Sequence, residues 1–153
     1  MTALDARPTA IADPARRAAD EELRITAREA DLRTMELKDQ LDCVVAIGLL
    51  MFFPREVVQA GLARIRDLVR SRGLTAVNVL IEGPPFMEVF RPCGYYLFRE
   101  NELPEAFAAW TTEYLKLSSF FQPRKIRSST SARWSLAGLA ARRASIVSFG
   151  GSG

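Results

Sequence analysis

Histidine and cysteine, which many enzymes use for proton transfer, nucleophilic attack or metal binding, are scarce in this chain. Its 153 residues contain no histidine and only two cysteines. Without imidazole, Ser/His/Asp catalysis, Cys/His catalysis and histidine-bound zinc sites are excluded. Cys43 and Cys93 lie fifty residues apart with no Cys-x-x-Cys pair, so neither a metal knuckle nor a redox motif is indicated. We expect both to be free, buried thiols in a reducing cytosol.

One turn occupies a position where α/β proteins often bind ligands. Gly83, Pro84 and Pro85 follow a segment expected to be a strand, and ligands of open α/β sheets bind at the carboxyl ends of strands. The two prolines lack the N–H groups that a phosphate cradle needs, so the turn is neither a P-loop nor a dinucleotide fingerprint. We interpret it as a plain structural turn, with a small-ligand site as the alternative.

Several glutamates lie near this turn in the sequence. They are Glu82, Glu88, Glu100, Glu102 and Glu105. A general acid/base pair requires two carboxyl groups that converge in a pocket, and nothing in the spacing indicates convergence. We therefore expect a solvated acidic rim and predict no catalytic, cofactor-binding or metal-binding residue.

The charge of the chain is distributed unevenly. The net charge is +3, yet seven positive side chains and no acid follow Glu113, so the preceding body is net negative. A basic segment of this kind can contact phosphates, anionic lipid or an acidic protein surface. The predicted contact residues for a polyanion or a partner are Arg124, Lys125, Arg127, Arg133, Arg142 and Arg143.

Composition divides the chain into four expected parts. Residues 1–12 are predicted to be a disordered lead-in, 13–41 a helical arm, 42–117 an α/β domain and 118–153 a flexible basic tail. The arm is expected to begin at Asp13, a capping residue followed by Pro14. The longest apolar run, residues 43–53, is shorter than the roughly 20 residues of a membrane span. We expect a buried strand in part of this run, although periodicity alone leaves a helix open.

Helices and strands are expected to alternate within the α/β domain. Apolar spacing predicts a helix over Arg55–Arg72 that ends at Gly73, and the β-branched segment Thr75–Glu82 predicts a buried parallel strand. The remaining expected elements are a helix over Phe86–Cys93, a strand over Tyr95–Phe98 and a helix over Leu103–Leu117. This alternation predicts an α/β fold with a small, mainly parallel sheet flanked by helices.

Part of the domain resembles a known family. Residues 61–110 contain, in order, GLARIRDLVRSRG, TAVNVLIE, GPP, FMEVFRPCG and ELPEAFAAW. In this order they resemble the second half of a STAS domain, the module of anti-sigma factor antagonists and sulfate-transporter-like proteins. The Asp-Ser-Ser/Thr turn of that family, which presents a phosphorylatable hydroxyl, would fall near Phe53, Pro54 and Arg55, where no Ser or Thr stands. The resemblance thus implies a partner-docking scaffold without phosphoregulation at that turn.

The leading hypothesis is a nonenzymatic regulatory or protein-interaction module of bacterial, cytoplasmic type, with a protein partner and no cofactor. One alternative is a likeness to the cofactor-binding half of a GNAT acetyltransferase, which implies acyl-CoA-dependent N-acyl transfer. That likeness falls on Gly61, Leu62, Ala63 and on Cys93, Gly94, Tyr95, with Val58 in place of the expected Gln or Arg. A second alternative is nonspecific binding of nucleic acid or an anionic membrane through the basic tail.

Overall fold

The computed structural model of this chain describes residues 1–37, 39–82, 96–122 and 132–144. The chain divides into two compact units, Met1–Lys38 and Asp39–Gly153. Each unit has its own pair of parallel strands.

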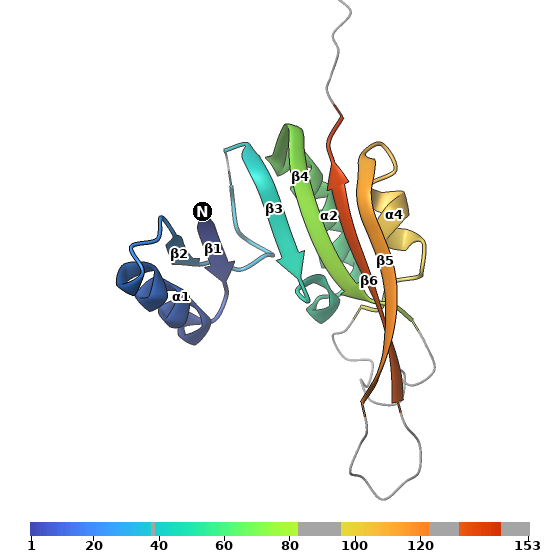
Figure 1. Cartoon of the computed structure of the whole chain (residues 1–153). Coiled ribbons are helices and arrows are strands. Elements are labelled where there is room, and N and C mark those ends of the chain that lie inside the picture. Colours follow the sequence, from blue (N-terminus) through green and yellow to red (C-terminus); the bar gives the residue numbers. More distant parts are fainter. Residues whose placement is uncertain (38, 83–95, 123–131, 145–153) are drawn as a thin grey trace, which may run out of the picture. The chain divides into compact units, whose positions relative to one another are not determined.

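The first unit is a small βαβ unit (Figure 1). β1 (Thr2–Asp5) is followed by α1 (Pro8–Asp20) and then by β2 (Thr26–Glu29). The two strands are parallel, with Thr2 opposite Thr26 and Asp5 opposite Glu29. The carboxyl ends of both strands therefore lie at the same edge of this two-stranded sheet.

The disordered lead-in expected over residues 1–12 and the helical arm expected over 13–41 are both wrong. α1 begins at Pro8 rather than Asp13, because Pro8 supplies the fixed φ that suits a first helical position. In the turn before it, Asp5 Oδ1 accepts the Arg7 N–H at 2.9 Å. The helix ends at Asp20, and Glu22 then adopts the left-handed φ of 52° that turns the chain toward β2.

The second unit contains a four-stranded sheet with helices on one face (Figure 1). Its elements are β3 (Leu41–Ile47), the 3₁₀ turn η1 (Leu50–Phe52), α2 (Arg55–Leu68), β4 (Val69–Leu80), α4 (Glu102–Ala106), β5 (Thr111–Gln122) and β6 (Ala132–Arg142). The strand order is β3-β4-β6-β5. β3 and β4 are parallel, whereas β6 is antiparallel to both β4 and β5.

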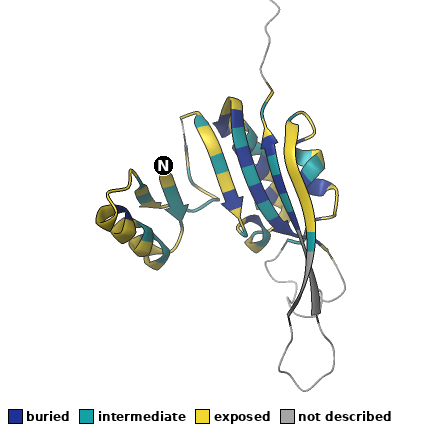
Figure 2. Cartoon of the chain, viewed as in Figure 1, coloured by how far each residue is buried: buried dark blue, intermediate teal, exposed yellow. Residues whose placement is uncertain are grey.

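The core of this unit lies between the sheet and α2. Val58, Leu62 and Ile65 form the buried stripe of α2, at the helical spacing that the sequence indicated. Alternate residues of the central strands β4 and β6 are buried, among them Val77 and Leu139, which lie opposite each other (Figure 2). The sheet is therefore packed on the face that carries these residues.

The opposite face of β3 is exposed and apolar. Val45 is 63% exposed and Ile47 is 62% exposed. Parallel strands are normally buried on both faces, so this edge of the sheet departs from the usual pattern. Among the described residues, no helix is long and apolar enough to cross a membrane.

Two expectations for the second unit are confirmed in part, and a third is wrong. A strand does occupy part of the apolar run 43–53, although it begins at Leu41 and ends at Ile47. The predicted helix over Arg55–Arg72 exists but ends at Leu68, where β4 starts. Gly73 is not a helix stop but a residue of β4, at which a Cβ atom would lie 2.6 Å from Val69 Cγ1 and 2.9 Å from the Asp42 carbonyl oxygen.

The expected C-terminal helix and tail are wrong. Only Glu102–Ala106 is helical, and Thr111–Gln122 is strand β5 rather than the end of a helix over 103–117. β6 lies within the segment expected to be a flexible tail. The sheet is accordingly mixed rather than mainly parallel, since two of its three strand pairs are antiparallel. The coarser expectation of an α/β fold is confirmed.

Candidate functional site

Carboxylates lie at the carboxyl-end edge of the first unit, where β1 and β2 end. Asp5 is the last residue of β1, Glu29 is the last of β2, and Asp31 follows two residues later. The Ala30 N–H donates to the Asp5 carbonyl oxygen at 3.0 Å, which fixes the turn after β2 against the end of β1. Ligands of parallel α/β sheets bind at such an edge, so it is the candidate site.

Arg33 forms an ion pair with Asp31. Its Nη2 lies 2.5 Å from Asp31 Oδ2, its Nε lies 3.0 Å from both carboxylate oxygens, and its backbone N–H donates to Oδ1 at 2.9 Å. The side-chain hydrogen bond, aided by the backbone one, lowers the pKa of Asp31 from 3.8 to about 2. Asp31 is therefore ionised at neutral pH and can only accept hydrogen bonds.

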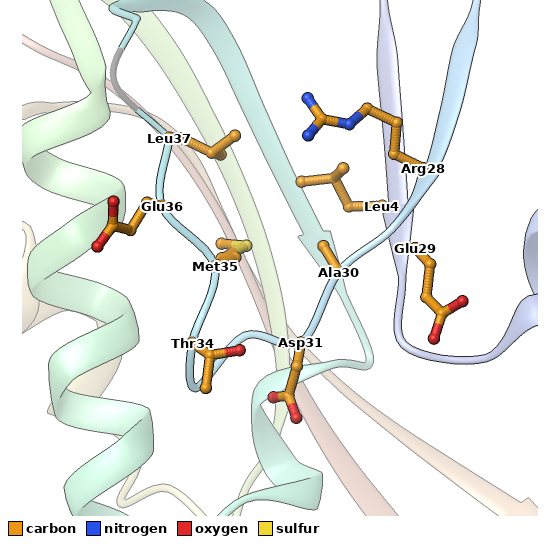
Figure 3. Close-up of a pocket in the computed structure, with 9 residues that line it drawn as sticks. All are labelled: Leu4, Arg28, Glu29, Ala30, Asp31, Thr34, Met35, Glu36 and Leu37. Carbon is orange, nitrogen blue, oxygen red and sulfur yellow. The ribbon is translucent and has the colours of Figure 1, made fainter.

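A pocket of about 380 Å³ opens beside this edge (Figure 3). Its lining comprises Leu4, Arg28, Glu29, Ala30, Asp31, Thr34, Met35, Glu36 and Leu37. The volume falls within the roughly 300–1,000 Å³ of small-molecule sites. β1, β2 and the segment that follows β2 supply all of these residues, so the first unit builds the pocket alone.

A second polar cluster, in the other unit, surrounds a buried carboxylate. Glu102, the first residue of α4, is 6% exposed. Its Oε1 accepts from the Tyr96 hydroxyl and from Gln59 Nε2 at 3.0 Å, and its Oε2 accepts the Arg99 backbone N–H at 3.1 Å. The Arg55 guanidinium lies 5.6 Å from the centre of the Tyr96 ring. We name these five residues the Glu102 cluster; it joins the segment that begins at Tyr96 to α2.

The phenol of Tyr96 gives the cluster a pH dependence. Burial and the hydrogen bond to Glu102 raise the pKa of Tyr96 from 10.0 to about 12. The folded protein thus binds this proton more tightly than the unfolded chain, so the stabilisation is complete below pH 10 and is lost as pH rises through about 12. We expect the difference in free energy of unfolding between the wild type and Tyr96→Phe to shrink over this range, as measured by urea denaturation. A constant difference would contradict this assignment.

The glutamates and cysteines expected from the sequence do not form a single site. Glu82, Glu100 and Glu105 are exposed, as an acidic rim requires, but Glu102 is buried. Cys43 is free but exposed, because it lies on the uncovered face of β3. The turn at Gly83, Pro84 and Pro85 lies outside the described residues, as do Glu88 and Cys93. Within the described part of the chain, no cluster of three or more His, Cys, Asp or Glu side chains could hold a metal ion.

The last two of the predicted contact arginines belong to the folded unit rather than to a free tail. Arg142 Nε pairs with Glu113 Oε1 at 2.8 Å. Arg143 Nη1 donates to the carbonyl oxygens of Arg66 at 2.9 Å and Val69 at 2.5 Å, where α2 ends and β4 begins. Arg133 lies in β6, and Arg124, Lys125 and Arg127 lie outside the described residues. The role of these residues in contacting a partner stays a prediction.

Adjacent arginines allow a matched test of this anchoring. We expect Arg143→Ala to lower the free energy of unfolding by about 2 kcal/mol, because hydrogen bonds from a charged group to two carbonyls are lost. Arg142→Ala removes an exposed ion pair and one exposed hydrogen bond, to the Arg72 carbonyl oxygen, and should change it by about 1 kcal/mol or less. Urea denaturation of both variants measures the two effects. Equal effects would mean that Arg143 does not anchor the end of β6.

Comparisons with known proteins point to one class of fold. A sequence model of the family described as "Methyltransferase domain" matches residues 1–73. TehB from Haemophilus influenzae superposes with a TM-score of 0.76 at 20% identity, over 93% of this chain and 49% of TehB. Magnesium protoporphyrin IX methyltransferase (ChlM) from Synechocystis PCC 6803, solved with bound S-adenosylhomocysteine, gives 0.67 at 13% identity over 94% of this chain and 64% of ChlM. The [4+2]-cyclase SpnF gives 0.66 at 13% identity, over 94% of this chain and 66% of SpnF.

The chain therefore shares the fold of these structures, which include S-adenosylmethionine-dependent methyltransferases. It spans about half the length of TehB and just under two thirds of the length of ChlM and SpnF. No curated protein sequence matches it.

These matches overturn the resemblance of residues 61–110 to a STAS domain, and with it the hypothesis of a nonenzymatic regulatory module. The segments that suggested it, such as the helix at 61–73 and the strand at 75–82, occur in many α/β folds. Here they belong to α2 and β4 of a sheet that continues with an antiparallel strand pair. The acetyltransferase likeness and polyanion binding through the tail find no support.

The carboxylates at the carboxyl-end edge of the first unit were missed by reasoning from sequence. The signal lay at the start of the chain, where the short segment Thr2–Asp5 leads through Pro8 into a helix. With a second short strand at Thr26–Glu29, this is a βαβ unit whose strands both end in acids. A strand of four residues is short for recognition by pattern alone.

Proposed function

We propose that this chain is part of an S-adenosylmethionine-dependent methyltransferase, and that the carboxyl-end edge of the first unit binds the nucleoside of the cofactor. The observation that carries the proposal is the coincidence of the family match with this edge. The matched residues, 1–73, contain β1, α1 and β2, and the acids lie where both strands end. A protein with the same fold has been solved with S-adenosylhomocysteine bound.

The chemistry of the edge fits a nucleoside. In dinucleotide-binding folds, an acid at the end of a strand accepts hydrogen bonds from ribose hydroxyls, and Asp5 occupies such a position with its side chain 37% exposed. Asp31 is ionised and 28% exposed, so it can accept from an exocyclic amine. Neither role requires a bound metal ion.

The cofactor would supply an electrophilic methyl group on a sulfonium, and the residues described here would bind and orient it. The fold alone does not select the reaction, because SpnF, with a similar TM-score, is described as a cyclase. Cofactor binding is therefore the property to test first. It also separates this proposal from acyl-CoA-dependent transfer, which would require a different ligand.

Titration of the chain with S-adenosylhomocysteine tests the proposal. A ligand at a hundred times its dissociation constant stabilises the folded state by about 2.7 kcal/mol, so a rise in melting temperature is expected. Acetyl-CoA at the same concentration should produce none. Isothermal titration calorimetry then gives the dissociation constant for each variant.

Asp5→Asn and Asp20→Asn form a matched pair, because both remove one negative charge from the first unit. Asp5→Asn should weaken binding about tenfold or more, the effect of losing a charged hydrogen bond. Asp20 is exposed at the last residue of α1, so its substitution should leave the dissociation constant unchanged. No saturable binding by the wild type, or equal weakening in both variants, would refute the assignment of Asp5.

A further inference from the structure

Arg28 is a basic side chain on the wall of the pocket in the first unit, and it has no acidic partner there. It lies on β2 opposite Leu4 of β1, so the two side chains are on the same face of the sheet. Asp5, one residue further, points to the other face. Among the described residues, no carboxylate forms an ion pair with Arg28, although Asp31 and Arg33 pair close by.

Three long apolar side chains line the pocket together with Arg28. Figure 3 shows the side chains of Leu4, Met35 and Leu37 directed toward the cavity, with the Arg28 guanidinium at its opening. The carboxylates of Glu29, Asp31 and Glu36 point away from it. The cavity thus combines one positive charge with three apolar side chains, although acids outnumber bases along its lining.

We propose that this pocket binds a small organic anion with an apolar body, in which the carboxylate pairs with Arg28 and the body lies against Leu4, Met35 and Leu37. A guanidinium holds a carboxylate through two parallel hydrogen bonds, which fixes its orientation as well as its charge. An apolar body displaces water from the floor of the cavity. The volume of about 380 Å³ accommodates a two-ring aromatic acid.

This inference goes beyond the proposed function, because it concerns the face of β1 and β2 that carries Leu4 and Arg28 rather than Asp5. A carboxylate could reach Arg28 from two sources: a separate organic acid, or the amino-acid end of the cofactor. The shared chemistry is a carboxylate beside an apolar group. The experiment therefore uses one ligand of each kind.

The test is a titration of the intact chain with 2-naphthoate, followed by NMR of the leucine and methionine methyl groups. Saturable shifts are expected at Leu4, Met35 and Leu37. 2-Naphthol, which keeps the rings but is uncharged at neutral pH, should bind about tenfold more weakly or worse, as expected when one charged hydrogen bond is lost. Arg28→Gln should weaken naphthoate binding to the same extent and leave naphthol binding unchanged.

Arg16→Gln is the matched control, since Arg16 lies on α1 with its side chain 69% exposed and outside the pocket lining. Naphthoate binding should be unchanged in this variant. Shifts confined to methyl groups of the second unit, or equal affinity of the wild type and Arg28→Gln, would overturn the proposal. The second titration uses S-adenosylhomocysteine. If this ligand displaces naphthoate and binds Arg28→Gln more weakly than the wild type, the site binds the carboxylate of the cofactor. That result would overturn the proposal that the pocket binds a separate organic acid. Absence of S-adenosylhomocysteine binding would count against the proposed function only.

Discussion

Val79→Asp is expected to abolish cooperative folding of the second unit. Val79 is 0% exposed, in a strand that has a hydrogen-bonded neighbour on each side. Its opposite residue in β6, Ala137, is also fully buried. An unpaired carboxylate at this position would have to leave water, at a cost of several kcal/mol. Domains of this size are stable by only about 5–15 kcal/mol, so the folded state should not persist.

Asn78→Asp provides the control for this prediction. Asn78 is the adjacent residue of β4, its side chain points to the opposite face, and it is half-exposed. Its substitution introduces the same charge where water can still reach it, so the variant should unfold cooperatively close to the wild type. Circular dichroism during thermal unfolding measures both. A cooperative transition in Val79→Asp near that of Asn78→Asp would mean that the register of β4 is wrong.

The parts of the fold that could be predicted are those with strong local signals. α2 combines an apolar stripe at helical spacing with a proline immediately before it, and β4 carries the β-branched run at Thr75–Leu80. Each signal is contained in one segment and survives in the tertiary structure. What these signals did not supply was the exact end of α2, because the chain passes from helix to strand at Leu68 and Val69 without an intervening loop.

The strands near the chain's end could not be predicted because their stability depends on a distant partner. The aromatic residues Phe107, Trp110 and Tyr114 recur at helical spacing, which favoured one long helix. In the structure Phe107 directly follows the end of α4, and its ring contacts Trp110 at a centroid distance of 5.2 Å. From Thr111 the chain instead forms β5, which pairs with β6. Tertiary pairing thus overrides the local preference.

The candidate site was hidden for a related reason. Asp5 and Asp31 are separated by a helix and lie close together only because β1 and β2 are parallel. In the sequence each is an ordinary surface acid among many. The pocket is similar, since Leu4 and Arg28 meet through strand register while Met35 and Leu37 arrive from the segment after β2.

Glu102 was expected in a solvated rim, and its burial makes it the most consequential acid in the second unit. Removing its carboxylate leaves hydrogen-bond donors without an acceptor: the Tyr96 hydroxyl, the Gln59 amide and the Arg99 N–H. Each unsatisfied buried donor costs about 1–3 kcal/mol, less where water can enter. The three donors come from α2 and from the segment that precedes α4, so the loss loosens both.

We therefore expect Glu102→Ala to lower the free energy of unfolding by about 3 kcal/mol. This is less than the loss of three separate hydrogen bonds would give, because the part-buried donors regain some hydration. Glu102→Gln keeps one acceptor oxygen and should lose about half as much. Glu105→Ala is the matched control: it lies one turn along in α4 and is exposed, so its effect should stay within about 0.5 kcal/mol. Urea denaturation of the three variants at neutral pH measures these differences. If Glu102→Ala proves as stable as Glu105→Ala, the Glu102 cluster does not join α2 to the segment that begins at Tyr96.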